Sequence, residues 1–151
     1  MMRSLARSLL VLGVVATTAA AQPPGEAPGR YDPNAEMSYG GVVIGVISVT
    51  GPDGAVGVHL SLKTATGAIV KVHLGPAMFI GMNDFFFFTD DPVTVKGAYV
   101  SHDGDVALWA REINKNGKTL TLRSPDGTPR WPFATADDPD GCGIPHAPIR
   151  Y

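Results

Sequence analysis

Strict alternation in residues 56–75 constrains the fold of this chain more than any other stretch. Every second residue is apolar in each of its two arms, at Val58, Leu60 and Leu62 and then at Val70, Val72 and Leu74. A period of two is typical of half-buried β-strands. Because Ala65-Thr66-Gly67 is short and ends in a glycine that tolerates positive φ, we predict an antiparallel hairpin with a three-residue loop.

The register of this hairpin follows from its apolar faces, which must lie on one side of the sheet. A three-residue loop sets Leu62 opposite Val70 and His59 opposite His73. The other face then carries the remaining residues of both arms, which are His59, Ser61, Lys63, Ile69, Lys71 and His73. We expect this second face to be exposed to solvent.

The rest of the chain adds further strand-like runs between turn signals, at residues 41–50, 93–101, 106–113 and 118–123. Gly45 and Gly97 interrupt two of these runs, as glycines at bends or bulges do. Residues 76–84 follow no strand pattern and predict a short helical or irregular insert. We therefore predict the all-β class and a small five- to six-stranded OB-like Greek-key barrel, with the insert between its third and fourth strands.

The N-terminal residues 1–21 have the pattern of a secretory signal peptide. Arg3 and Arg7 precede a short apolar run, and Ala19-Ala20-Ala21 fits the small-residue rule for cleavage. The alternative is an N-terminal membrane anchor, although the apolar run is too short to span a bilayer. We expect a periplasmic or secreted protein with a flexible Pro/Gly-rich arm at 22–39, the barrel at 40–132 and a disordered tail at 133–151.

Charge argues against a nucleic-acid partner. The chain has 12 Lys and Arg against 14 Asp and Glu, and cleavage would remove Arg3 and Arg7 to leave a formal charge of −4. This acidic balance does not provide the broad basic surface that nucleic-acid binders need. No other apolar run approaches the length of a membrane span.

Several segments together resemble a known group of proteins. They are His73–Pro76, Met78–Ile80, Asp91–Gly97, Ala107–Ile113 and Leu120–Trp131. In this order they are similar to small exported bacterial proteins with an OB-like domain, which are similar in build to the periplasmic bacterial OB-fold (BOF) stress proteins. The resemblance implies an exported, non-catalytic OB-like domain, and it carries over no catalytic residue.

The second face of the hairpin is the candidate ligand site, because OB barrels usually bind through this part of the sheet. Its candidate residues are His59, Ser61, Lys63, Lys71 and His73. Opposed histidines lie close enough to share one Zn²⁺ or Cu²⁺, with a third ligand from Met78, Asp84, His102, a partner or water. The alternative is a cross-strand polar pair on a solvated sheet.

The aromatic run Phe85–Phe88 is the candidate partner site. If alternate rings enter the core, the others remain outside beside the insert. The predicted patch consists of Met78, Phe79, Phe86 and Phe88, and its alternative is a place in the core. An exposed apolar patch of this kind suits a protein partner or a membrane surface.

The function predicted from these features is an exported, non-catalytic binding module. It engages a small-molecule ligand or a protein partner through the second face of the hairpin and the aromatic run. The alternative is a periplasmic Zn or Cu protein that uses His59 and His73. No nucleophile–base pair, carboxylate dyad or cofactor motif is readable, so we expect no enzyme activity and no cofactor other than that metal.

Overall fold

β-strands are the main elements of the structure, a computed structural model that describes residues 29–50, 54–102 and 104–132. The elements are η1 (Pro33–Ala35), β1 (Met37–Thr50), β2 (Val56–Thr64), β3 (Ile69–Pro76), α1 (Ala77–Met82), β4 (Pro92–His102), β5 (Asp105–Lys115) and β6 (Lys118–Thr121). The predicted signal peptide (1–21), the first part of the predicted arm (22–28) and the predicted tail (133–151) lie outside the described residues.

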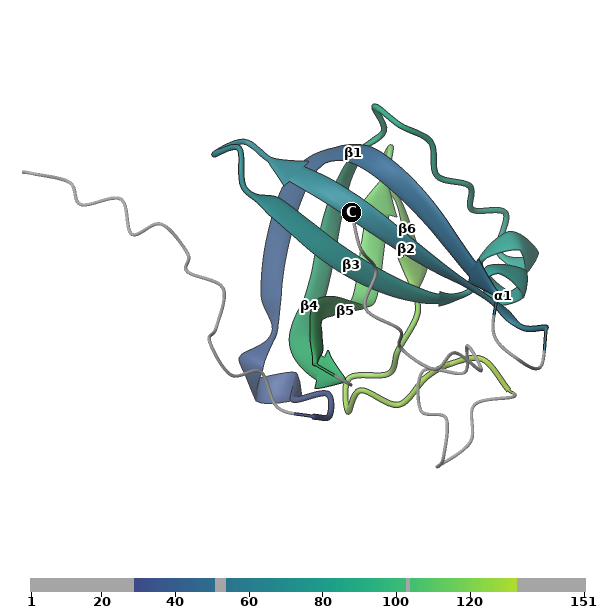
Figure 1. Cartoon of the computed structure of the whole chain (residues 1–151). Coiled ribbons are helices and arrows are strands. Elements are labelled where there is room, and N and C mark those ends of the chain that lie inside the picture. Colours follow the sequence, from purple (N-terminus) through teal and green to yellow (C-terminus); the bar gives the residue numbers. More distant parts are fainter. Residues whose placement is uncertain (1–28, 51–53, 103, 133–151) are drawn as a thin grey trace, which may run out of the picture.

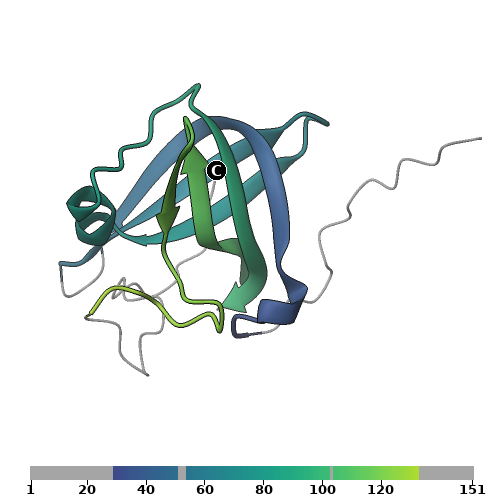
Figure 2. The ribbon, with the colours of Figure 1, turned by 180° about the vertical axis from the view of Figure 1, so that it is seen from behind.

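The strands form one sheet that curls into a barrel (Figures 1 and 2). Their order is β3-β2-β1-β4-β5-β6, with antiparallel neighbours throughout. A parallel pairing of β3 with β5, at Val72 with Leu108 and His73 with Trp109, closes the barrel. The predicted all-β, OB-like barrel with a short insert after its third strand is thereby confirmed.

The β2–β3 hairpin has the predicted register. Leu62 lies opposite Val70, and His59 lies opposite His73. Gly67 has the positive φ of 85° that the three-residue loop requires. The alternating pattern was therefore sufficient to set both the pairing and the apolar face of this element.

The N-terminal boundary of the fold differs from the prediction. β1 begins at Met37 rather than near Gly40, and η1 precedes it with an Asp32 carboxylate that accepts a hydrogen bond from the Asn34 amide. The early start follows from pairing with β4, since Met37 lies opposite Gly97 and Val42 opposite Pro92. Part of the predicted flexible arm is thus an ordered piece of the sheet.

Gly97 marks one of the irregularities in the sheet. The β4–β5 register shifts between Lys96 and Gly97, as the sequence predicted. A Cβ atom at position 97 would lie 2.0 Å from the carbonyl oxygen of Trp109. Only glycine permits this close approach of β4 to β5, which bends the pair around the barrel.

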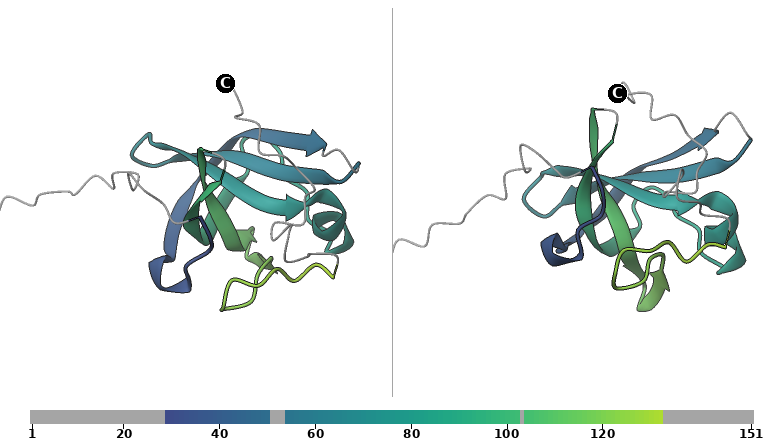
Figure 3. Two further views of the ribbon diagram at one scale, coloured as in Figure 1. Left: turned by 60° about the horizontal axis from the view of Figure 1, so that its bottom comes forward. Right: turned by 90° about the horizontal axis from the view of Figure 1, so that it is seen from below.

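The barrel interior holds the main hydrophobic core. Its completely buried residues come from every long strand and include Val43, Leu60, Leu62, Val72, Leu74, Val95, Leu108 and Ile113. Ile80 of α1 and the rings of Phe85 and Phe87 add to it from the insert. In Figure 3, α1 and η1 lie at opposite ends of the barrel.

Candidate functional site

The two histidines of the β2–β3 hairpin form a close pair. Nδ1 of His73 lies 3.2 Å from Nε2 of His59, and their ring centroids are 4.6 Å apart with the rings nearly perpendicular. At this distance one nitrogen carries a proton and donates it in a hydrogen bond to the other. The predicted juxtaposition of these side chains is confirmed.

The prediction that this face is exposed is wrong at its histidine end. His59, Ser61 and His73 are 5%, 8% and 1% exposed. One reason is the β3–β5 pairing, which brings the Trp109 ring to 5.2 Å from the His73 ring. Hairpin alternation could not foresee this neighbour because Trp109 is 36 residues further along the chain.

The two lysines of the predicted ligand face differ in their surroundings. Lys63 is exposed, whereas the Lys71 ammonium lies 2.5 Å from a carboxylate oxygen of Asp105, with both side chains about one-fifth exposed. The five predicted ligand residues therefore lie on one side of the hairpin, and Lys63 is the most exposed of them. Ligand binding by these residues stays a prediction.

A buried arginine that the sequence did not single out lies against Trp109, the aromatic neighbour of His73. Arg123 is 1% exposed, and its guanidinium carbon lies 4.8 Å from the Trp109 ring centroid and 5.1 Å from that of Trp131. Its Nη1 donates a hydrogen bond to the carbonyl of Gly127. Stacking between aromatic faces suits the planar guanidinium group. A cavity of about 410 Å³ borders Arg123, Trp109 and Tyr31.

The run Phe85–Phe88, which follows α1 and is called the aromatic insert below, shows the predicted alternation. Phe85 and Phe87 are buried, while Phe86 and Phe88 are 62% and 65% exposed. Lys115 anchors this segment to β5, because its ammonium donates to the Phe86 carbonyl and pairs with Asp91 at 2.5 Å. The hydrogen bond from Lys115, assisted by one from the Phe88 amide, holds the pKa of Asp91 below its usual range.

The other two residues of the predicted patch lie on α1. Met78 is 61% exposed, as expected for a contact residue. Phe79 instead turns partly inward, with its ring centroid 5.7 Å from that of Trp131. Met82 is 76% exposed on the same helix.

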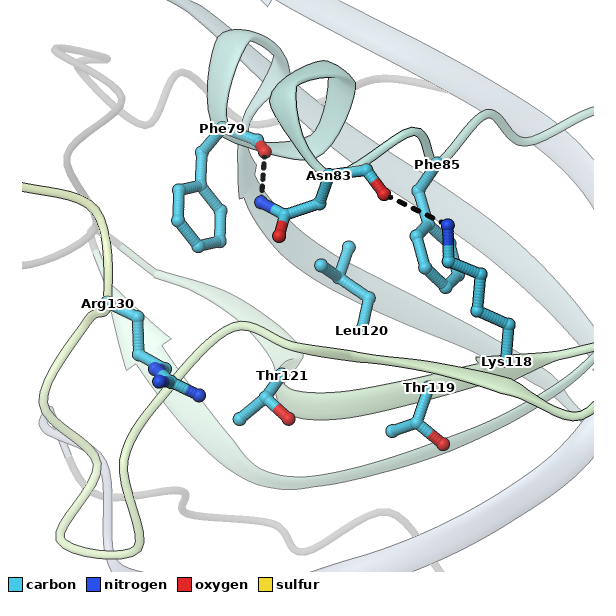
Figure 4. A pocket seen from close by; sticks show the side chains of 8 residues that line it. All are labelled: Phe79, Asn83, Phe85, Lys118, Thr119, Leu120, Thr121 and Arg130. Carbon is cyan, nitrogen blue, oxygen red and sulfur yellow. Dashed lines mark hydrogen bonds between the residues drawn. The ribbon is translucent and has the colours of Figure 1, made fainter.

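A cleft of about 380 Å³ opens between α1 and β6 (Figure 4). Phe79, Asn83 and Phe85 line one side, and Lys118, Thr119, Leu120, Thr121 and Arg130 line the other. Sequence reasoning missed this site because its residues come from three separate segments. The two cations gave a weak signal, since isolated Lys and Arg residues are common on solvated surfaces.

A carboxylate missed by the sequence analysis ties η1 to the barrel. Arg111 places Nε 2.6 Å and Nη2 3.2 Å from the two carboxylate oxygens of Glu36, and the Tyr31 hydroxyl donates at 2.7 Å. Burial alone would raise the pKa of Glu36, but the hydrogen bonds from Arg111, Tyr31 and Lys96 outweigh it and lower that pKa. Arg111 also pairs with Glu112.

Metal binding at the histidine pair would need further ligands. Within the described ranges, no group of three or more His, Cys, Asp or Glu side chains is placed to hold an ion. Two nitrogens bound to one tetrahedral zinc lie about 3.3–3.4 Å apart, given bonds of about 2.0–2.1 Å. The separation of 3.2 Å between the two ring nitrogens is close to this value.

Comparison with protein families identifies the family of this chain. Residues 35–120, more than half of the chain, match the model of the MamS/MamX magnetosome protein family. The matched segment runs from η1 to β6 and includes the histidine pair and the aromatic insert, but it ends before Arg123 and Arg130. No curated protein matches the chain. Nothing in these comparisons supports the predicted likeness to the BOF stress proteins.

Among solved structures, the chain is similar to the dimeric N-terminal domain of PriB protein from Thermoanaerobacter tencongensis. The two are 12% identical with a TM-score of 0.46, and the match covers 56% of this chain and 99% of that domain.

Neither α1 nor η1, the helices of the described residues, has the length and hydropathy of a membrane span.

Proposed function

We propose that this chain, which belongs to the MamS/MamX magnetosome protein family, is an exported, non-catalytic OB-like binding module that engages a protein partner through its aromatic insert. The signal-like pattern of residues 1–21 supports export. The single observation that carries the binding role is the exposure of Phe86 and Phe88, each more than three-fifths open to solvent.

The exposed apolar surface of two phenylalanines is unfavourable in water, and a bound partner would bury it. Burying one such side chain contributes about 1.5–3 kcal/mol, and aromatic residues are enriched at protein interfaces. The insert is also held in place, because Lys115 bonds to the Phe86 carbonyl and the Phe88 amide donates to Asp91. A fixed backbone reduces the ordering cost of binding.

The test of this role is site-specific photo-crosslinking in the native cells. A photoreactive residue replaces Phe86 or Phe88 in the full chain, and Ile69 serves as the matched control because it is 66% exposed but lies on the β2–β3 hairpin. We expect positions 86 and 88 to give one shared crosslinked protein, identified by mass spectrometry. Equal crosslinking from position 69 would contradict the proposal, as would products that contain only the chain itself.

A second candidate function is supported by the histidine pair. Its nitrogens are 3.2 Å apart, and neighbouring strands hold both rings in a buried site. Such preorganisation favours a transition metal that accepts imidazole ligands, which here is Zn²⁺ or Cu²⁺. Further ligands would come from water, a partner or residues outside the described ranges.

Titration calorimetry with Zn²⁺ and Cu²⁺ tests the metal-binding alternative. We expect a dissociation constant of micromolar or below for the full chain, and no heat for His59→Ala or His73→Ala. Ser61→Ala, on the same face of β2, should bind as the parent chain does. Added metal should also raise the thermal midpoint, since it binds the folded state. Absence of heat with either metal, or equal heat in the histidine variants, would eliminate this function.

A further inference from the structure

The cleft between α1 and β6 has a positive charge balance within an acidic protein. The chain as a whole carries a formal charge of −2, yet the residues lining this cleft include Lys118 and Arg130 and no acid. Lys118 donates to the Asn83 carbonyl at 3.2 Å, and its ammonium lies 4.9 Å from the Phe85 ring centroid. These contacts hold one cation at the rim, with Arg130 toward the other end (Figure 4).

Arg130 has no carboxylate partner among the described residues. The charged side chains nearest in the sequence have other contacts: Arg123 stacks between tryptophans, and the Asp126 carboxylate accepts a bond from the Thr128 amide. The Arg130 side chain is exposed, and its own backbone amide is fixed by a 3.0 Å bond to the Leu122 carbonyl. Its guanidinium group can therefore accept an anionic partner without breaking an ion pair within the described part.

β6 supplies a backbone edge beside these cations. Among the strands of the described residues it is the last in the sheet order and lies next to β5. The turn at Asn116-Gly117, with φ values of 53° and 79°, makes Lys115 and Lys118 a pair that exchanges hydrogen bonds. Because such pairs alternate along an antiparallel ladder, the amides and carbonyls of Thr119 and Thr121 point away from β5.

We propose that this cleft binds an extended acidic segment of another protein, which pairs with the outer edge of β6 and places carboxylates against Lys118 and Arg130. Backbone pairing would use Thr119 and Thr121, as in other cases where a peptide adds a strand to a sheet. Apolar side chains of the segment would lie against Phe79 and Leu120. This site is separate from the exposed rings of Phe86 and Phe88, so the proposal does not depend on the aromatic patch.

The exposed strand edge favours a peptide over the other anions that two cations could attract. A small carboxylate or phosphate would use Lys118 and Arg130 but not the groups on Thr119 and Thr121. Single-stranded nucleic acid would need a longer basic track than these two residues provide. The peptide uses the charges and the backbone edge together.

Fluorescence anisotropy on the full chain tests the proposal with a labelled octapeptide in which Glu alternates with Val. Two further peptides separate the charge contacts from the backbone pairing. One has Gln in place of Glu and lacks the charges, and one carries N-methyl groups on alternate amides and cannot pair along its backbone. We expect the Glu peptide to bind, with affinity about two- to fivefold lower in each of Lys118→Gln and Arg130→Gln. Arg30→Gln removes an exposed cation that does not line the cleft and should leave binding unchanged.

Hydrogen exchange provides a readout that a general charge effect would not change. Bound Glu peptide should slow exchange at the amides of Thr119 and Thr121, and the N-methyl peptide should not. Equal binding of the Glu and Gln peptides would overturn the proposal. Equal binding of the N-methyl peptide would also overturn it and would indicate a small-anion site. Displacement of the labelled peptide by an oligo-dT strand, but not by unlabelled Glu peptide, would overturn it as well and would indicate a nucleic-acid site.

Discussion

Glu36 shows how one side chain can attach the start of the fold to the barrel. Its carboxylate is 11% exposed and bonds to Arg111 of β5, Tyr31 and Lys96 of β4. Replacing it with glutamine would leave the mostly buried Arg111 without its main partner. We expect Glu36→Gln to lower the free energy of unfolding by about 1–3 kcal/mol at pH 7, measured by urea denaturation.

The pH dependence of this loss follows from the lowered pKa of Glu36. A depressed folded-state pKa adds stability above the unfolded-state pKa of about 4.3, and this stability disappears as the pH falls through the folded value. The difference between the parent chain and Glu36→Gln should therefore shrink below about pH 4. Glu112→Gln, which removes the more exposed partner of Arg111, should cost no more than about 1 kcal/mol. A gap that stays constant down to pH 3 would refute this assignment.

At the residue scale, the sequence predicted the residue pairs of the β2–β3 hairpin but not the burial of its histidine face. The register placed His59 against His73 because the two strands are consecutive and their alternation is strict. It could not show that Trp109 would cover His73, because that contact depends on barrel closure. The partners of Arg123 and Glu36 were equally hidden, since each contact joins segments distant in the chain.

At the scale of the element, Gly97 sets the bend of the β4–β5 pair. An added methyl group would meet the Trp109 carbonyl, so we expect Gly97→Ala to reduce the free energy of unfolding by about 1–3 kcal/mol. Gly81→Ala is the matched control, because no atom lies within 4 Å of a Cβ at that position in α1. Gly81→Ala should leave the free energy of unfolding unchanged or raise it by up to about 1 kcal/mol. Thermal or urea unfolding of both variants decides the point, and equal effects would contradict the close-approach argument.

For the segment between β3 and β4, the sequence predicted which phenylalanine rings are buried but not which distant residues they contact. Alternation alone gave the burial of Phe85 and Phe87 and the exposure of Phe86 and Phe88. The anchoring of the segment by Lys115 was not predictable, because it requires the end of β5 to lie beside it. Phe79 turned inward for a similar reason, since its neighbour Trp131 comes from beyond β6.

For the whole molecule, the fold class and the order of the elements could be predicted because they depend on local periodicity and turn chemistry. The closure of the barrel could not be predicted in this way. The contact between β3 and β5 covers two residue pairs, His73 with Trp109 and Val72 with Leu108, and neither strand carries a local signal for it. The candidate sites follow the same division: the patch and the histidine pair lie on continuous segments, while the cationic cleft is assembled only in the folded barrel.

The chain has two tryptophans, and both rings lie against the guanidinium group of Arg123. All indole emission from the folded protein therefore originates at one corner of the barrel. Trp109 there contacts the His73 ring, while Trp131 contacts Phe79 at the mouth of the cleft. Intrinsic fluorescence thus provides a label-free optical reporter next to both the histidine pair and the cationic cleft.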